Sequence, residues 1–299
     1  MICQETLHYN TRLLGYDMIM KLKPEAIDMI NTYSTSDVAK LIGIHPNTVR
    51  LYENLGLITR PERKINGYRV FTDYHLIQFR IARLAFQVEV LQNGLRKQAA
   101  AIVKSCASGD MDKALYLTDL YLRQISEEKL NGETAIQIAG QILSGHTHIT
   151  DDLLLTRTQA ALYLHITVDT LRNWERNGLL EEAKTQNGRR VYTSRDLERL
   201  IIIKSLRCAN YSLSAILRML SALSLNPEAS IRDAIDTPRP DDDILTACDH
   251  LLTSLEQARD NAEQIIILLS ELKKSESVNP HAGTDRITDD FPAPCQPDK

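Results

Sequence analysis

Two stretches of the chain carry the same order of apolar and polar positions, 122 residues apart. The first is Pro-Asn-Thr-Val-Arg-Leu-Tyr-Glu-Asn-Leu-Gly-Leu-Ile at 46–58, and the second is Val-Asp-Thr-Leu-Arg-Asn-Trp-Glu-Arg-Asn-Gly-Leu-Leu at 168–180. In both, an apolar residue, an arginine, an aromatic residue and a glutamate precede Gly-Leu and an aliphatic residue. This spacing predicts a short amphipathic helix in each stretch. The chain therefore contains an internal repeat of one helical surface.

A second short helix is predicted before each of these stretches. In the first copy, Ser34 and Asp37 form a capping-box pattern, Gly43 ends the helix and Pro46 occupies the first position of the next one. In the second copy, Thr156 and Gln159 form the capping box and Thr167 caps the following helix. The positions expected to face inward are Val38, Ala39, Leu41, Ile42, Ile44, Ala160, Ala161, Leu162, Leu164 and Ile166. Two short helices joined by a short turn predict a helix-turn-helix in each copy.

A two-stranded hairpin is predicted after each pair of helices. Asn66-Gly67 and Asn187-Gly188 each lie between extended, partly apolar arms. Asn-Gly favours a type I′ turn, because both central residues of that turn need positive φ. A third helix then begins at a threonine cap, which is Thr72 in the first copy and Thr193 in the second. Each unit is therefore expected to be a helix-turn-helix followed by a wing.

Charge is unevenly distributed along the 299 residues, whose net charge is −4. Residues 34–85 carry +4 and residues 155–220 carry +5, whereas the rest of the chain is acidic. The two repeats are thus basic islands, as expected if they alone approach phosphates. No apolar run is long enough to span a bilayer, and no secretion signal opens the chain. The five scattered cysteines fit a reducing cytoplasm and offer no zinc framework.

Both units resemble the winged helix-turn-helix of the MerR family of bacterial transcription regulators. The resemblance rests on Arg-x-aromatic-Glu-x-x-Gly-Leu, on the Gly-x-Arg-x-aromatic wing, and on Tyr211-Ser212-Leu213 followed by Ile216. The first copy departs from this pattern beyond its wing, where it reads Ala85-Phe86-Gln87 in place of a Gly-Phe-Ser-Leu-like segment. That departure leaves open whether the two units dock identically.

The resemblance also implies a long coiled-coil helix after each unit. An unbroken four-three spacing of apolar residues supports one in the second unit, at Leu251, Leu255, Ala258, Ala262, Ile265, Leu269 and Leu272. A weaker stripe follows the first unit, at Tyr121, Ile125, Glu128, Gly132, Ala135, Ala139 and Ile142. Residues 119–143 can pair with 244–272 inside one chain, which would give a pseudodimer. A homodimer through 244–272, or helices that pack on their own domains, are the alternatives, and we favour the pseudodimer.

The expected fold is therefore mainly α, with two MerR-like winged units, each followed by helices that include a long one. The predicted domains are an N-terminal extension at 1–33, the first winged unit at 34–104, a helical connector and linker at 105–154, the second winged unit at 155–223, a coiled-coil helix at 224–274 and a disordered tail at 275–299.

The second helix of each motif is expected to enter the major groove of DNA. The predicted base-reading residues are Asn47, Thr48, Arg50, Asp169, Thr170, Arg172 and Asn173. The resemblance implies that Arg69 and Arg190 hold phosphate from the wings, together with Lys64, Tyr68 and Arg189. It places Tyr52 and Trp174 near the DNA backbone or beneath the wing, with core packing as the alternative.

These features predict a cytoplasmic transcription regulator that binds promoter DNA through two non-identical units and distorts it. RNA polymerase is the partner that the resemblance implies, and a small-molecule effector is possible although no sensor is recognisable. A ligand-sequestering protein on the same scaffold is the alternative, and a DNA bender without transcriptional output is a third class. No cofactor or metal site is expected. The sequence contains no Gly-rich phosphate loop, nucleophile elbow or paired carboxylates, so we expect no enzyme activity.

Overall fold

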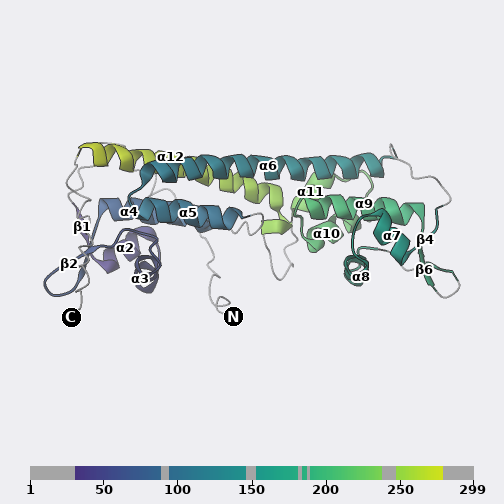
Figure 1. The fold of residues 1–299 in the computed structure, drawn as a ribbon, viewed down its shortest axis with the longest axis horizontal. Helices are drawn as coiled ribbons and strands as arrows, with labels where there is room; N and C mark the ends of the chain where they lie inside the picture. The colour runs from purple at the N-terminus through teal and green to yellow at the C-terminus, as the bar shows by residue number, and fades with distance from the viewer. Residues whose placement is uncertain are drawn as a thin grey trace, which may run out of the picture.

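The computed structural model of the chain describes residues 31–88, 94–145, 153–180, 184–186, 189–237 and 247–278. It is mainly α-helical, as predicted, and it is elongated, with one winged unit at each end and a long helical layer that joins them (Figure 1). None of the described helices is both long and apolar enough to cross a membrane.

The first unit contains a helix-turn-helix whose ends are set by local hydrogen bonds. Its helices are α2 (Thr35–Ile42) and α3 (Pro46–Asn54). The Asp37 amide donates to Ser34 Oγ at 3.3 Å and the Ser34 amide donates to Asp37 Oδ2 at 3.0 Å, which confirms the capping box. Gly43 ends α2 in the left-handed conformation, with φ of 70°, which a residue with a Cβ atom adopts only with strain.

The second unit repeats this arrangement in α7 (Arg157–Tyr163) and α8 (Val168–Arg176). The Thr156 amide donates to Gln159 Oε1 at 2.9 Å, and the Thr170 amide donates to the Thr167 hydroxyl at 3.0 Å, so both predicted caps are present. The helices after the wings are α4 (Asp73–Gln87) and α9 (Ser194–Cys208), which start at the predicted caps Thr72 and Thr193. The second unit continues with α10 (Leu213–Leu225) and α11 (Ile231–Asp236).

Each wing belongs to a three-stranded sheet, which corrects the predicted two-stranded hairpin. In the first unit β3 (Arg69–Thr72) lies between β1 (Thr32–Tyr33) and β2 (Glu62–Arg63). In the second, β6 (Arg189–Tyr192) lies between β4 (Leu155–Thr156) and β5 (Lys184–Gln186). All pairs are antiparallel. Strands of two residues have no readable periodicity, so β1 and β4 gave no signal in the sequence.

The turn of the first wing also differs from the predicted type I′ turn. The Gly67 amide donates to the Lys64 carbonyl at 2.7 Å, and the Lys64 amide donates to the Tyr68 carbonyl at 2.8 Å. Only Gly67 has positive φ there, at 81°, whereas a type I′ turn requires it at Asn66 as well. This pattern is a three-residue loop in which the glycine takes the left-handed position. Asn187 and Gly188, at the other predicted turn, lie outside the described residues.

A small core holds the first helix-turn-helix together. It consists of Val38, Ala39, Val49, Ile58, Phe71, Leu76 and Phe79. The predicted inward positions are mostly confirmed, but Leu41 and Leu162 are wrong, with 52% and 74% of their surface exposed. Each lies near the end of its short helix, where a small rotation decides whether the side chain meets the core.

The long helices form the layer that joins the two units. They are α5 (Leu95–Ala107), α6 (Met111–Leu143) and α12 (Leu251–Val278), the last preceded by a 3-10 turn, η1 (Ala247–Asp249). α6 starts before the predicted residue 119 and α12 starts after the predicted residue 244. The predicted domain limit at 33 falls at the end of β1 and separates this strand from its sheet, and the limits at 104, 223 and 274 fall inside α5, α10 and α12.

α6 and α12 run antiparallel and pack against each other (Figure 1). Every seam residue predicted for α12 is buried, as are those of α6 apart from Glu128, which is half-buried. Glu128 accepts a hydrogen bond from Asn210 in the second unit at 3.1 Å. α12 returns to the first unit, where Asn261 donates to the Leu84 carbonyl and to Gln87 Oε1, both at 3.2 Å. Each long helix therefore contacts the unit that lies at the other end of the chain.

The stability of the first unit should depend on pH through His75. The Thr72 amide donates to His75 Nδ1 at 3.1 Å, and burial lowers the pKa of this ring from about 6.5 to about 4. The unfolded chain therefore takes up the proton first as pH falls, and stability should decrease between about pH 6.5 and pH 4. We expect a loss of roughly 2 kcal/mol at pH 5 relative to pH 7.5 in urea unfolding.

The matched control is His75→Gln, because glutamine also serves at this capping position but does not titrate. This variant should lose less stability than the natural chain between pH 7.5 and pH 5. Equal pH dependence of the two proteins would show that His75 is not the responsible group.

Candidate nucleic-acid interface

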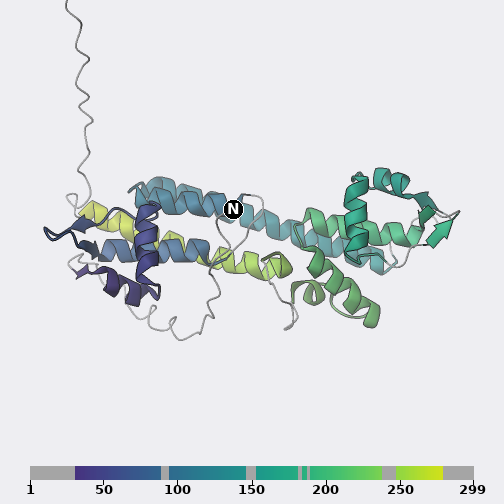
Figure 2. The same ribbon diagram turned by 90° about the horizontal axis from the view of Figure 1, so that it is seen from below.

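The two helices that repeat in the sequence, α3 and α8, lie on one side of the molecule. Figure 1 shows them at opposite ends of the long axis and on the side away from α6. The view from that side, Figure 2, shows both helices crossing the long axis. One surface therefore presents both repeats at once.

The two helices turn the same two positions toward the core, and the exposed positions are also equivalent in the two helices. Val49 and Leu171 are fully buried at equivalent places. The next aromatic residue also packs inward: Tyr52 stacks on Phe79 with ring centroids 5.6 Å apart, and Trp174 is only 4% exposed. The structure thus supports the core-packing alternative for both aromatic residues, and burial raises the pKa of Tyr52.

The outward face of each helix carries exposed polar side chains, and on α3 it also carries the exposed Leu51. Arg50 Nη1 donates to Asn47 Oδ1 at 3.0 Å, and Arg172 Nη1 donates to Asp169 Oδ1 at 2.8 Å. All four residues are exposed, and so is Asn173, which accepts from Asn177 Nδ2 at 3.2 Å. Thr48 and Thr170 are half-buried, and the Thr170 hydroxyl contacts Thr167 at 2.8 Å as part of the cap. In both α3 and α8, therefore, an exposed arginine donates a hydrogen bond to the side chain three residues before it.

The wing arginines point inward to a glutamate, which is on α3 in the first unit and on α8 in the second. In the first unit Glu53 binds Arg69 and, at 3.4 Å, Arg63. The side chain of Glu53 is only 7% exposed. These contacts tie the wing to α3. The predicted phosphate contact of Arg69 therefore has to be made by a guanidinium that already binds a carboxylate.

The second unit repeats this tie with more partners. Glu175 binds Arg190 at 3.4 Å and Arg157 at 3.0 Å, and it accepts a hydrogen bond from the Tyr192 hydroxyl. Burial and the bond to Glu175 raise the pKa of Tyr192 to about 12, so the phenol stays protonated. The Arg190 guanidinium also lies 5.2 Å from the centroid of the Tyr192 ring. Sequence reasoning missed both glutamates as positioning residues, although each is part of the repeated motif.

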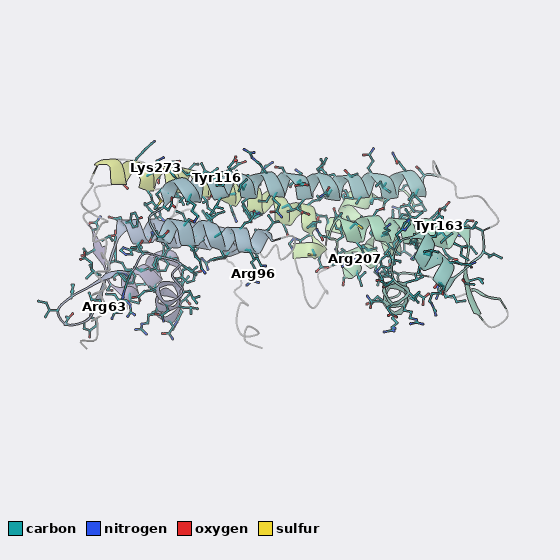
Figure 3. The ribbon with its side chains drawn as sticks, in the orientation of Figure 1. Arg63, Arg96, Tyr116, Tyr163, Arg207 and Lys273 are labelled. Atoms are coloured by element: carbon teal, nitrogen blue, oxygen red, sulfur yellow. The ribbon has the colours of Figure 1, made fainter. Side chains whose placement is uncertain are left out.

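The tip of the first wing is exposed. Lys64, Ile65, Asn66 and Tyr68 all lie at the surface, and Ile65 is fully exposed. Figure 3 places Arg63 on this wing. In the second wing, Arg189 lies in β6, but its side chain is outside the described residues.

A further basic residue, Arg96 at the start of α5, lies on the same side as α3 and α8 (Figure 3). It was missed because the first copy departs from the repeat at this point. In the sequence, only its basic side chain could have identified Arg96 as a candidate for phosphate contact, and the structure adds that it is exposed.

Two family comparisons match the chain in the regions that contain these helices. The family described as "MerR HTH family regulatory protein" matches residues 155–223, and the one described as "MerR family regulatory protein" matches residues 34–71. No solved structure matched the chain.

Curated relatives cover single regions of the chain. The transcriptional regulator CueR of Escherichia coli O157:H7 is 47% identical over 53 residues, which are 18% of this chain and 39% of that protein. CueR of Salmonella typhi is also 47% identical over 53 residues, 18% of this chain and 38% of that protein. The transcriptional regulator ZntR of Escherichia coli K12 is 37% identical over 71 residues, 23% of this chain and 50% of that protein.

The chain thus spans half or less of the length of these three relatives. The matches fall on both copies of the repeat, and each copy forms a helix-turn-helix with a wing. The chain therefore carries two helix-turn-helix units of the MerR type in one polypeptide, at 34–71 and 155–223.

Proposed function

We propose that this protein is a transcription regulator in which one chain binds one DNA duplex through α3 and α8. The observation that carries the proposal is the placement of both helices on one side of the molecule (Figure 2). Equivalent positions of the two helices are exposed there. Two helices presented in this way can enter two major-groove segments on one face of a duplex. The exposed Arg50 and Arg172 supply the charge and the planar donors that bind guanine or phosphate.

The pairing of α6 with α12 favours a single chain over a homodimer. The apolar seam of α12 is already buried within the chain, since Leu251, Leu255, Ile265, Leu269 and Leu272 are at most 3% exposed. A second copy could use this seam only after the two helices had separated. We therefore propose a monomeric pseudodimer, in which each unit takes the place of one subunit of a dimer.

The operator should be an imperfect repeat, because the two outward faces differ. α3 presents Asn47 next to Arg50, whereas α8 presents Asp169 next to Arg172. Each unit should therefore prefer its own bases. Binding through two units at opposite ends of a stiff helical layer also favours distortion of the intervening DNA, at a cost of several kcal/mol drawn from the contacts.

RNA polymerase and a small-molecule effector enter the proposal only through similarity to the family. A regulator of promoters would act in the cytoplasm. The ligand-sequestering alternative is less well supported, because a protein that only captures a ligand gains nothing from an exposed arginine on each of two reading helices.

Light scattering combined with a gel-shift titration tests the proposal. A footprinted promoter fragment and the purified full chain should form a complex of one chain and one duplex. Affinity should fall steeply as salt rises from 50 to 200 mM, by about tenfold or more, because phosphate contacts release counterions. Two chains on each duplex would contradict the pseudodimer, and absence of any duplex binding at low salt would contradict the function itself.

A further inference from the structure

The outward faces of α3 and α8 can be compared position by position. Both helices have nine residues, and Val49 and Leu171 are buried at the same relative position. A helix turns by about 100° per residue, so the residue two places after buried Val49 or Leu171 points about 200° away from it. Those residues are Leu51 and Asn173. They occupy the middle of the outward face, beside Arg50 and Arg172.

The two units differ in chemistry at this central position. Leu51 is 50% exposed, so this position of α3 presents an apolar side chain to solvent. The equivalent Asn173 is also exposed, and its side chain is oriented by the Asn177 amide, 3.2 Å away. Asn54 and Arg176 differ as well, but they end their helices, whereas base edges are read by residues nearer the N-terminus.

Leucine and asparagine suit opposite members of one base pair. An apolar side chain in the major groove can contact the C5 methyl group of thymine, and an asparagine can bind N6 and N7 of adenine through its amide. We propose that Leu51 selects thymine in the half-site under the first unit, and that Asn173 selects adenine at the equivalent place under the second. This inference rests on the proposed DNA-binding function and names two residues that make its operator asymmetric.

The first experiment compares sites recovered from a randomised duplex library by the full-length natural chain and by Leu51→Asn. The variant should exchange thymine for adenine at one position of one half-site, which makes the recovered site more symmetric there. The reciprocal variant Asn173→Leu should change the other half-site from adenine to thymine. Leu41→Asn is the matched control, because Leu41 is similarly exposed, at 52%, but lies on α2. It should leave every base preference unchanged.

The second experiment removes single atoms from the DNA. Deoxyuridine at the selected thymine lacks only the methyl group, and it should weaken binding by the natural chain by about three- to fourfold. Leu51→Asn should bind both duplexes equally. At the adenine under the second unit, 7-deazaadenine should weaken binding by about five- to tenfold, and Asn173→Leu should abolish that difference.

The inference is overturned if the natural chain binds its selected duplex but Leu51→Asn recovers the same site and responds equally to deoxyuridine. In that case the DNA-binding function stands and the assignment of Leu51 fails. If the natural chain recovers no duplex even at low ionic strength, the proposed function fails first and the inference with it.

Discussion

Reversing the charge of both reading-helix arginines, in Arg50→Glu with Arg172→Glu, should lower the affinity for the promoter fragment by on the order of a thousandfold or more. Each substitution removes a charge-assisted contact and places a carboxylate against phosphate or a base acceptor. The loss is large because the two units belong to one chain, so binding of one unit normally holds the other close to the DNA. When both units bind weakly, this gain in affinity is lost as well. Fluorescence anisotropy with a labelled duplex at fixed salt measures it.

Folding should survive these substitutions, because both arginines are exposed and an exposed ion pair contributes little to stability. The matched control is Arg123→Glu with Arg259→Glu, which makes the same change in net charge on α6 and α12. Those residues are also exposed, and they belong to the long helices α6 and α12 and not to α3 or α8. The control should bind almost normally. Similar losses in both double variants would show that net charge, not the reading helices, governs binding.

Replacing Leu252 with alanine should cost roughly 3 kcal/mol in the free energy of unfolding, measured in urea. Leu252 is 1% exposed and lies over Gly132 of α6, so the substitution leaves a cavity between α12 and α6. A Cβ atom at Gly132 would lie 3.1 Å from Leu252 Cδ2 and 3.4 Å from the Tyr211 hydroxyl. The absence of a side chain at Gly132 thus lets α6 approach the start of α12 and the second unit closely.

A double-mutant cycle checks this close approach. Alanine is favoured over glycine in a helix by about 1 kcal/mol, but in the natural chain the added methyl group meets Leu252. Gly132→Ala should therefore stabilise the Leu252→Ala variant by more than it stabilises the natural chain, with a coupling of about 0.5 to 1 kcal/mol. Gly140→Ala is the control, because its nearest neighbour, Ile231 Cδ1, is at an ordinary 3.6 Å. Its effect should be additive with Leu252→Ala, and equal coupling at both glycines would contradict the predicted contact.

Local signals in the sequence predicted the elements of both units well. The capping boxes at Ser34 and Thr156 and the cap at Thr193 are confirmed, because each depends on hydrogen bonds between residues three apart. The predictions that were wrong concern rotation and turn geometry. Leu41 and Leu162 are exposed, and the first wing has a three-residue loop in place of a type I′ turn. The rotation of a short helix and the geometry of a wing turn both depend on tertiary contacts with neighbouring elements, which the local sequence does not specify.

The predicted interface was less complete. Exposed positions on α3 and α8 follow from helical periodicity, so Asn47, Arg50, Asp169, Arg172 and Asn173 were identifiable as surface residues. The glutamate partners of the wing arginines could not be identified from the sequence. Glu53 and Arg69, for example, are 16 residues apart and meet only when the wing folds back on α3. Whether the predicted residues contact DNA stays a prediction.

The sequence by itself determined that one helix-turn-helix surface occurs twice, where its helices begin, and which residues of the long helices form apolar seams. Those features depend on periodicity and on contacts within a few residues. Only the tertiary structure decided that the two seams meet inside one chain, where Lys129 of α6 binds Glu256 of α12, 127 residues away. It also decided that α12 reaches α4, where Asn261 donates to the Leu84 carbonyl, 177 residues away. An apolar seam lowers its free energy by burial against any matching seam, so its pattern does not specify the partner.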